Sequence, residues 1–495
     1  MPTELTPEAQ LAAEATVREK LRSGALNIVD GTVIGVSSTA PAYSLTATML
    51  LVSGAIGFWA PSAMIIAFLP MLGVAIGFYW LNKVIPDCGA SYAWVSKALH
   101  PALGFFTGWV ILAADVIVML SLAQVSAQST LTLIGLDASN LALDIIFGVG
   151  WIVFLTWVVY KGIQLSAKLQ WLMLGLEFFI VMAFSAFAIA QVYVSHPKGS
   201  HVFNWSWILP WTAPGGGAKV LLAVLAAVFI FWGWDTAANV NEETESSTTV
   251  PGLATVYSTL ALVIIYVFAS AALVMRVPNS SLNSNSAALE TMAQSVVGNN
   301  RLWYIMVLAV ASSAAASTQT TILPFARVSF SMARDRIIPK AFAWVHKENL
   351  TPWFGTLVIG AVSVVLDIIA TISSGVNSVM VDAVTAIGLL IAFYYGLTGV
   401  AATWYYRRML FASVQNFILA GICPLAGGLG FFYIFYQAAQ GLTIRQFWLG
   451  MGSMLLGIPL LIWSWFHNPA YYRQRPEYAT PDVVGGPTGS VAPAQ

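Results

Sequence analysis

Apolar runs about as long as a bilayer is thick recur along nearly the whole chain of 495 residues. A helix needs roughly 20 apolar residues to cross the hydrocarbon core, whereas a barrel strand needs only about 10. Twelve runs reach the helical length. The chain is also 58% apolar and only 8% charged, far below the roughly 25% charged residues of soluble domains. The sequence therefore predicts an all-α integral membrane protein with about 12 transmembrane helices.

The boundaries of the twelve predicted helices follow the ends of the apolar runs. They comprise residues 25–53, 58–83, 100–133, 141–160, 168–193, 219–243, 253–276, 302–331, 354–373, 381–405, 413–437 and 446–466. Residues 1–24 are predicted as a cytoplasmic amphipathic segment, and residues 467–495, rich in Pro, Gly and small residues, as a disordered cytoplasmic tail. The transmembrane domain is expected over residues 25–466, with loops at about 194–218 and 277–301.

Positive charge is divided unevenly between the two sides of the predicted bundle. With the N-terminus inside, 16 of the 21 Lys and Arg residues fall on inner segments, which is the bias of cytoplasmic connections. Both termini are thus predicted to be cytoplasmic. The formal net charge is zero, so no nucleic-acid partner is indicated. Because Cys88 and Cys423 are the only cysteines, a disulfide or a thiolate metal site has no support.

Two of the twelve runs, the first and the sixth, contain residues that weaken a helix. The first includes "DGTVIGVSSTAPAYS", with two glycines, three hydroxyl residues and Pro41, and the sixth includes "FWGWDTAANVNEE". Breaks five helices apart indicate an inverted repeat with a binding site near the middle of the membrane. We expect two five-helix repeats at about 25–193 and 219–405, followed by helices 11 and 12 over 413–466.

A break in a membrane helix exposes backbone groups that are tolerated only where they are buried in protein or line a cavity. The free amides at the start of a half-helix suit a carboxylate, and the free carbonyls at the end of the other half suit an ammonium group. A zwitterionic amino acid fits both ends of such a site.

Four stretches resemble the amino acid/polyamine/organocation (APC) superfamily of permeases, over about residues 25–405. "DGTVIGVSSTAP" is similar to the first helix of that superfamily and "FWGWDTAANVNEET" to its sixth. "IPDCGASYAWVSKALHPALGFFTGW" resembles the segment after helix 2, and "ARVSFSMARDRIIPKAFAWVHKENLTPWFG" resembles the loop after helix 8. The resemblance implies the LeuT-like fold and a secondary active transporter that moves an amino acid or related amine across the plasma membrane by alternating access.

The resemblance also indicates which residues contact the substrate. In the superfamily a turn of helix 1 holds the substrate carboxylate, and here Gly35, Val36 and Ser37 fall on that turn, although Val36 and Ser37 replace a Ser and a Gly. It also places a gating aromatic at Phe229. The predicted substrate-binding residues are Gly35, Val36, Ser37, Ser38, Thr39, Asp115, Phe229, Trp232, Gly233, Trp234 and Asp235.

Two carboxyl groups are predicted to carry protons. Sodium-independent members of the superfamily often have a Lys in helix 5, seven residues after a Gln, and this chain has Gln170 followed by Glu177. An ionised carboxylate at that depth costs about 3 kcal/mol or more, so Glu177 is expected to be protonated, paired or hydrated. Asp235 binds an amine or a proton in this interpretation; a plain helix N-cap is the alternative.

Other interpretations of the site remain open. Ser313, Ser317 and Thr318 on helix 8 offer hydroxyls for a sodium ion, so sodium coupling or exchange of a polyamine or basic amino acid is an alternative to proton coupling. A non-transporting amino-acid receptor and a channel are further alternatives. Glu242 and Glu243 either meet water at the inner end of helix 6 or pair with Arg327 or Arg334. No phosphate loop, HExxH motif or nucleophile elbow occurs, so neither an enzyme nor a cofactor is expected.

Overall fold

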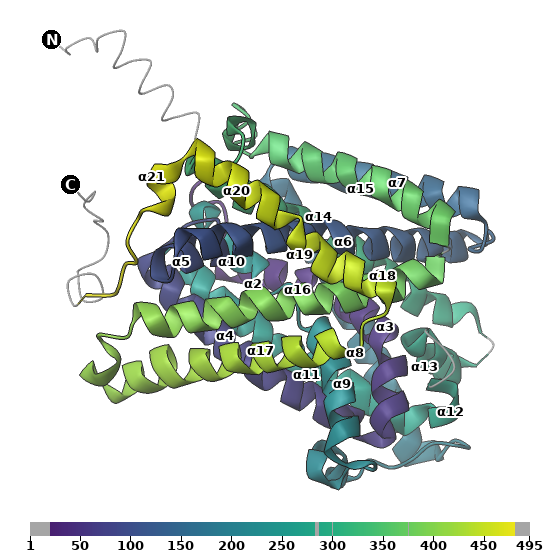
Figure 1. Cartoon of the computed structure of the whole chain (residues 1–495). Helices are drawn as coiled ribbons and strands as arrows, with labels where there is room; N and C mark the ends of the chain where they lie inside the picture. The colour runs from purple at the N-terminus through teal and green to yellow at the C-terminus, as the bar shows by residue number, and fades with distance from the viewer. Residues whose placement is uncertain (1–19, 283–286, 299, 375, 481–495) are drawn as a thin grey trace, which may run out of the picture.

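The computed structural model describes residues 20–282, 287–298, 300–374 and 376–480, and within these ranges every regular element is a helix (Figure 1). Residues 1–19 and 481–495, which hold most of the predicted amphipathic segment and disordered tail, lie outside the described residues. Ten helical spans are long and apolar enough to cross a membrane. The first of them covers two predicted helices, and the interrupted sixth helix is too short to be counted among the ten. The twelve predicted helices are therefore present.

The helices follow the predicted order of two five-helix halves and two further helices. The first half comprises α2 (Ile28–Ser38) with α3 (Pro41–Ile56), α4 (Ala60–Val84), α6 (Pro101–Ile134), α7 (Leu141–Tyr160) and α8 (Ile163–Ser195). The second comprises α9 (Gly216–Ile230) with α10 (Thr236–Asn239), α11 (Val250–Arg276), α14 (Tyr304–Arg334), α15 (Trp353–Ser374) and α16 (Val376–Tyr405). Helix 11 contains α17 (Cys423–Gln440), and helix 12 contains α18 (Ile444–Phe447), α19 (Ser453–Leu455) and α20 (Gly457–His467).

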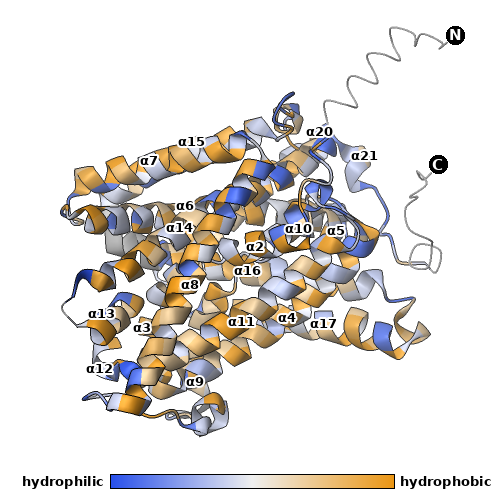
Figure 2. Cartoon of the chain, turned by 180° about the vertical axis from the view of Figure 1, so that it is seen from behind, coloured by the Kyte–Doolittle hydropathy of each residue, from blue (hydrophilic) through white to orange (hydrophobic). Residues whose placement is uncertain are grey.

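Helices at matching positions of the two halves pack against each other. α4 packs on α11, α6 on α14 and α7 on α15, and the last pair lies side by side along one edge in Figure 1. This pairing agrees with the predicted inverted repeat. Hydrophobic residues cover the outer helices in Figure 2, and α8 exposes Leu172, Phe179 and Phe187. Such a surface fits contact with lipid rather than water.

Three short helices in the connections between the twelve spans were not predicted. They are α5 (Ser91–Ala98), α12 (Asn279–Leu282) and α13 (Ala288–Val297), the last two within a connection predicted as a loop. The chain end also differs from the prediction. Residues 467–480 include α21 (Pro469–Tyr472), and Glu477 and Ala479 donate backbone hydrogen bonds to other segments. The predicted disordered tail is therefore wrong for residues 467–480, because buried Tyr471 and Tyr472 anchor them.

The break in helix 1 lies later than the resemblance implied. α2 continues to Ser38, Ala40 has a left-handed φ of 46°, and Pro41 begins α3. Proline lacks an N–H and disfavours a helical conformation in the preceding residue, so it fixes the break at this point. The predicted turn at Gly35, Val36 and Ser37 is wrong, since all three lie inside α2.

The break in helix 6 lies directly against the break in helix 1. α9 ends at Ile230 and α10 begins at Thr236, and between them Gly233 has a φ of 121°. A Cβ on Gly233 would lie 2.6 Å from the Ser38 carbonyl oxygen. The Ser38 and Thr236 hydroxyl oxygens are 2.9 Å apart, so one donates to the other. Glycine at position 233 therefore permits both the turn and the close approach of the two breaks.

We expect Gly233→Ala to lower the free energy of unfolding by about 1–3 kcal/mol, because alanine would be strained at this φ and would collide with Ser38. Thermal unfolding of the purified protein in detergent measures the change. Gly175→Ala on the exposed face of α8, where nothing lies within 4 Å, is the control and should leave stability unchanged or raise it by up to about 1 kcal/mol. Equal melting temperatures for both variants would contradict the expectation.

Candidate functional site

A small cavity of about 10 Å³ lies where the two helix breaks meet. It is lined by Ser38, Ile111, Asp115, Trp232, Gly233, Asp235, Thr236, Thr321, Pro324 and Tyr394. A cavity of this size holds on the order of one water molecule. Binding of a molecule as large as an amino acid therefore requires the surrounding helices to move apart.

The Asp235 carboxylate is held by two tyrosine side chains of α16. Tyr394 donates to Oδ2 at 2.9 Å and Tyr395 donates to Oδ1 at 2.8 Å, while the Trp232 indole N–H donates to the Tyr394 hydroxyl. Asp235 occupies the N-cap position of α10, but its side chain makes no capping bond there, so an N-cap role does not account for this carboxylate. Both of its oxygens point instead toward the cavity wall formed by α16.

A second acid, Asp115 of α6, lines the same cavity. It is 2% exposed, and its Oδ2 has no hydrogen-bond partner among the described residues. The ten residues that line the cavity include two carboxyl groups and no Lys, Arg or His. Because buried carboxylates need partners, this composition favours a cationic or proton-donating group between them.

Five of the eleven predicted substrate-binding residues line the cavity, namely Ser38, Asp115, Trp232, Gly233 and Asp235. The other six, Gly35, Val36, Ser37, Thr39, Phe229 and Trp234, are not part of its lining. Phe229 packs in the apolar core instead. The ring of Trp234 stacks on Tyr395, with ring centres 5.1 Å apart.

Sequence reasoning missed the tyrosine pair of α16 and Thr321 of α14. The available signal was the motif "FYYG" within an apolar helix. Two adjacent tyrosines at that depth carry hydroxyl groups that need partners inside the protein.

Glu177 connects three helices beside the break in helix 1. Its Oε1 accepts hydrogen bonds from the Ala42 amide at 2.6 Å and from the Ser313 hydroxyl at 2.7 Å. The Ser313 hydroxyl in turn accepts from the Tyr43 amide at 3.2 Å. Glu177 is fully buried, and its Oε2 has no hydrogen-bond partner among the described residues. The free amides at the start of α3 thus face a carboxylate, as the helix dipole favours.

The residues of the alternative sodium site divide into two groups. The Ser313 hydroxyl faces Glu177, and the Ser317 hydroxyl donates to the Ser38 carbonyl oxygen at 2.8 Å, so both lie against the break in helix 1. Thr318 donates instead to Ala314 of its own helix. Only Ser313 and Ser317 are therefore placed beside the oxygen atoms that a cation would need.

One buried ion pair and one partly exposed group of ion pairs join the end of the sixth helix to α14. Arg327 contacts Glu243 at 2.6 Å with both side chains fully buried, and Arg334 contacts Glu242 at 2.6 Å and Asp87 at 3.3 Å. Of the two interpretations left open for Glu242 and Glu243, the structure shows pairing with the arginines rather than a helix end that only meets water. These contacts lie near the backbone bonds of Ala25 and Leu26 to Glu243, on the side of the bundle where both described chain ends lie. We call this side of the bundle the terminal side.

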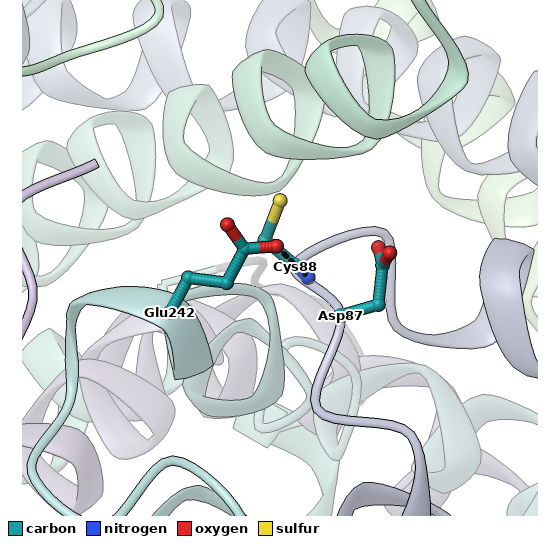
Figure 3. A group of neighbouring side chains, drawn as sticks. All are labelled: Asp87, Cys88 and Glu242. Atoms are coloured by element: carbon teal, nitrogen blue, oxygen red, sulfur yellow. Dashed lines mark hydrogen bonds between the residues drawn. The ribbon is translucent and has the colours of Figure 1, made fainter. Parts of the chain in front are cut away.

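Cys88 lies within this ion-pair network (Figure 3). Its amide donates to Glu242 at 3.1 Å, and its thiol lies 3.6 Å from Arg334. The potential ligand atoms of Asp87, Cys88 and Glu242 all lie within 4.8 Å of one another. The Arg334 guanidinium contacts all three residues, so this group of side chains already has a cation.

Comparison with known proteins identifies the class of protein to which this arrangement belongs. The profile of the amino acid permease family matches residues 25–459. The chain belongs to that family. It is 23% identical to the low-affinity putrescine importer of Escherichia coli K12 over 460 residues, covering 91% of this chain and 93% of the importer. It is 24% identical to the branched-chain amino acid permease of Bacillus subtilis over 384 residues, covering 71% and 76% of the two chains.

A further relative of this permease is the human Asc-type amino acid transporter 1, which is 23% identical over 334 residues, covering 63% of this chain and 60% of the transporter. The family and these relatives support a multi-pass membrane transporter of amino acids or amines rather than an enzyme.

We expect the Cys88 thiol of the permease to react slowly with maleimide, because burial and Glu242 raise its pKa well above the usual range. Glu242→Gln removes one cause of that shift and a partner of Arg334, so labelling should accelerate roughly tenfold. The rate is measured on a Cys423→Ser background. Glu245→Gln, which changes a nearby exposed glutamate, is the control and should leave the labelling rate unchanged. A labelling rate in Glu242→Gln as slow as in the parent would show that Glu242 does not protect the thiol.

Proposed function

We propose that this permease moves an amino acid or organic amine by alternating access, coupled to protons that bind at Glu177. The observation that carries the proposal is the pair of hydrogen bonds from Ala42 and Ser313 to one oxygen of a fully buried carboxylate. Glu177 thereby ties α8 to the start of α3 and to α14. A change in its charge acts directly on the helix that borders the substrate site.

Protonation of Glu177 changes the strength of these contacts. Hydrogen bonds to an ionised acceptor are roughly twice as strong as those between neutral groups, so the anion holds the start of α3 more tightly than the acid does. The anion is costly inside the membrane, whereas the acid is not. Proton binding therefore loosens α3 from α8 and α14, and proton release restores the contact. The two protonation states thus favour different positions of α3, as coupled transport requires.

Sodium coupling is the second candidate, because Ser313, Ser317 and the Ser38 carbonyl oxygen lie together beside the break in helix 1. Both hydroxyls already donate to oxygen atoms of the protein, and the Thr318 hydroxyl donates to the Ala314 carbonyl oxygen of its own helix. The hydroxyl hydrogens are therefore bonded within the protein without an ion, and we favour proton coupling over sodium coupling.

The first test uses Glu177→Gln in proteoliposomes. One proton moving down a gradient of one pH unit supplies about 1.4 kcal/mol, enough for roughly tenfold accumulation of substrate. We expect the parent protein to accumulate labelled putrescine or leucine when the outside is acidic. Glu177→Gln should exchange substrate without accumulating it.

Glu348→Gln, on an exposed loop, is the matched control and should accumulate substrate normally. Accumulation driven by a sodium gradient at equal pH would favour the sodium site and reject proton coupling. Binding without any flux would favour the receptor alternative.

The two acids of the central cavity support a substrate with an amino group. Asp115 of α6 and Asp235 at the break in helix 6 both line the cavity, and none of its ten lining residues is basic. A substrate ammonium group can donate hydrogen bonds to both carboxylates. Since Asp235 is already bonded to Tyr394 and Tyr395, these hydroxyls fix the direction in which its oxygens point.

We expect Asp235→Asn to raise the KM for putrescine roughly tenfold, because a charged hydrogen-bond acceptor is lost, and to raise that for leucine less. Tyr395→Phe removes one neutral donor and should raise the KM about threefold. Initial rates of uptake give these values. Tyr433→Phe on the exposed face of α17 is the control, and an unchanged KM in Asp235→Asn would remove Asp235 from the substrate site.

The orientation is part of the proposal. The terminal side carries most of the Lys and Arg residues, so we place it and both termini in the cytoplasm, with the permease in the plasma membrane. The ion pairs of Arg327 and Arg334 then close the cytoplasmic side of the substrate site. The side of α12 and α13 faces the exterior.

A further inference from the structure

A second cavity, of about 310 Å³, lies on the side of the bundle opposite the chain ends, between α3, α6, α13 and α14. Its polar and aromatic lining includes Tyr43, Thr46, Gln128, Ser129, Glu290 and Trp303. It shares no lining residue with the central cavity. Its volume is within the range of about 300–1,000 Å³ typical of small-molecule pockets. The outer cavity is therefore large enough for an amino acid or a diamine, unlike the central one.

Several polar atoms of the outer cavity have no satisfactory partner. The hydroxyl oxygens of Tyr43 and Thr46 and Oε2 of Glu290 are all buried without a hydrogen bond of good geometry among the described residues, although the Tyr43 hydroxyl lies near that of Ser121. Thr46 nevertheless lies close enough to Glu290 to lower the pKa of its carboxyl group. Glu290 is the one of these groups that can carry a charge, and its neighbour Thr46 is a neutral hydroxyl, so the buried carboxyl group favours a ligand that donates hydrogen bonds.

The charge of the lining indicates the same kind of ligand. Glu290 is its one acid, and the lining holds no Lys, Arg or His. The nearest cations of the elements packed on α13 are Arg276, which donates to the Ser295 carbonyl oxygen, and Arg301 at the start of η5 (Arg301–Trp303). A carboxylate beside an aromatic ring such as Trp303 suits an ammonium group, which pairs with the acid and lies over the ring.

We propose that this cavity is an outer binding site for the ammonium group of an incoming amine or amino acid, with Glu290 as its anionic contact. The proposal rests on the transport function proposed above. The outer cavity is linked to the proposed proton site through Tyr43. The Tyr43 amide donates to the Ser313 hydroxyl, which donates to Glu177. Tyr43 thus lines the outer cavity and is linked through Ser313 to Glu177.

The first experiment compares Glu290→Gln with Asp137→Asn in proteoliposomes. Asp137 is an exposed acid in the connection between α6 and α7 on the same side and does not line the cavity, so its variant removes the same charge without touching the site. We expect Glu290→Gln to raise the KM for putrescine roughly tenfold with little change in the maximal rate. Asp137→Asn should behave like the parent. Equal KM values in all three proteins would overturn the proposal.

The pH dependence supplies a second readout with a defined sign. Burial raises the pKa of Glu290 to about 7, so its ionised fraction rises about tenfold between roughly pH 6 and pH 8. Putrescine should bind the outer site more tightly at the higher pH. This is opposite to the acid stimulation expected from proton coupling, and Glu290→Gln should abolish it. Loss of acid stimulation in Glu290→Gln, with KM unchanged, would instead make Glu290 a proton relay and overturn the amine site.

A labelling experiment separates this proposal from the transport proposal. Thr132 lines the outer cavity, and Thr132→Cys on a Cys88→Ser, Cys423→Ser background gives one thiol for maleimide. Putrescine should slow its labelling several-fold, and adding Glu290→Gln should abolish this protection. Protection without uptake of any amine would reject transport and leave the outer site standing. Normal uptake without protection would leave transport standing and reject the outer site.

Discussion

The structure depends on the contact between two broken helices in the middle of a membrane. Backbone groups freed by a break cannot find water in hydrocarbon, so they must find partners in the protein. The Ser38 carbonyl accepts from Ser317, the Thr39 carbonyl accepts from Ser44, and the Ile230 carbonyl accepts from Tyr266. Helices α11 and α14 thus supply hydroxyls to both breaks. Any movement that opens the site has to replace these bonds.

Glu177 and Asp235 both lie where the broken helices meet the helices packed around them. Glu177 reaches from α8 to the first amides of α3, and Asp235 reaches from the sixth helix to the tyrosines of α16. The Glu177 carboxylate therefore joins α8 to α3, and the Asp235 carboxylate joins the sixth helix to α16, whose Tyr394 also lines the central cavity. In such an arrangement a proton or an ammonium group that changes the charge also changes which helices are held together.

The sequence predicted the helices well because membrane crossing depends on local composition, which can be read directly from the sequence. The exact place of the first break was missed, because the family resemblance placed the turn at Gly35, Val36 and Ser37. Instead Gly35 allows α2 to pack on α11, where a Cβ would collide with Ser258. The effect of Pro41 on Ala40 was the stronger local signal.

The candidate site was only partly predictable for a different reason. Asp235 and Asp115 were found because acids in apolar helices are rare and costly. Tyr394 and Tyr395 were missed because their role depends on α16 lying beside the sixth helix, which no local pattern reveals. Glu290 was missed because a short amphipathic helix in a polar connection resembles a surface loop. The proposed role of Glu290 depends on the cavity that α13 covers, which only the structure reveals.

The two ion pairs of the terminal side differ in a way that bears on how this side opens. Arg327 and Glu243 are fully buried, so separating them without water would leave two unpaired charges, at a cost of about 3–5 kcal/mol. The side chains of Arg334 and Glu242 are 26% and 21% exposed, so water can replace their contact at a much lower cost. In the proposed transport cycle, opening of the terminal side would therefore begin most easily at Arg334 and would uncover Cys88, which contacts both members of that pair. Arg327 and Glu243 can remain joined while α14 and the end of the sixth helix move together.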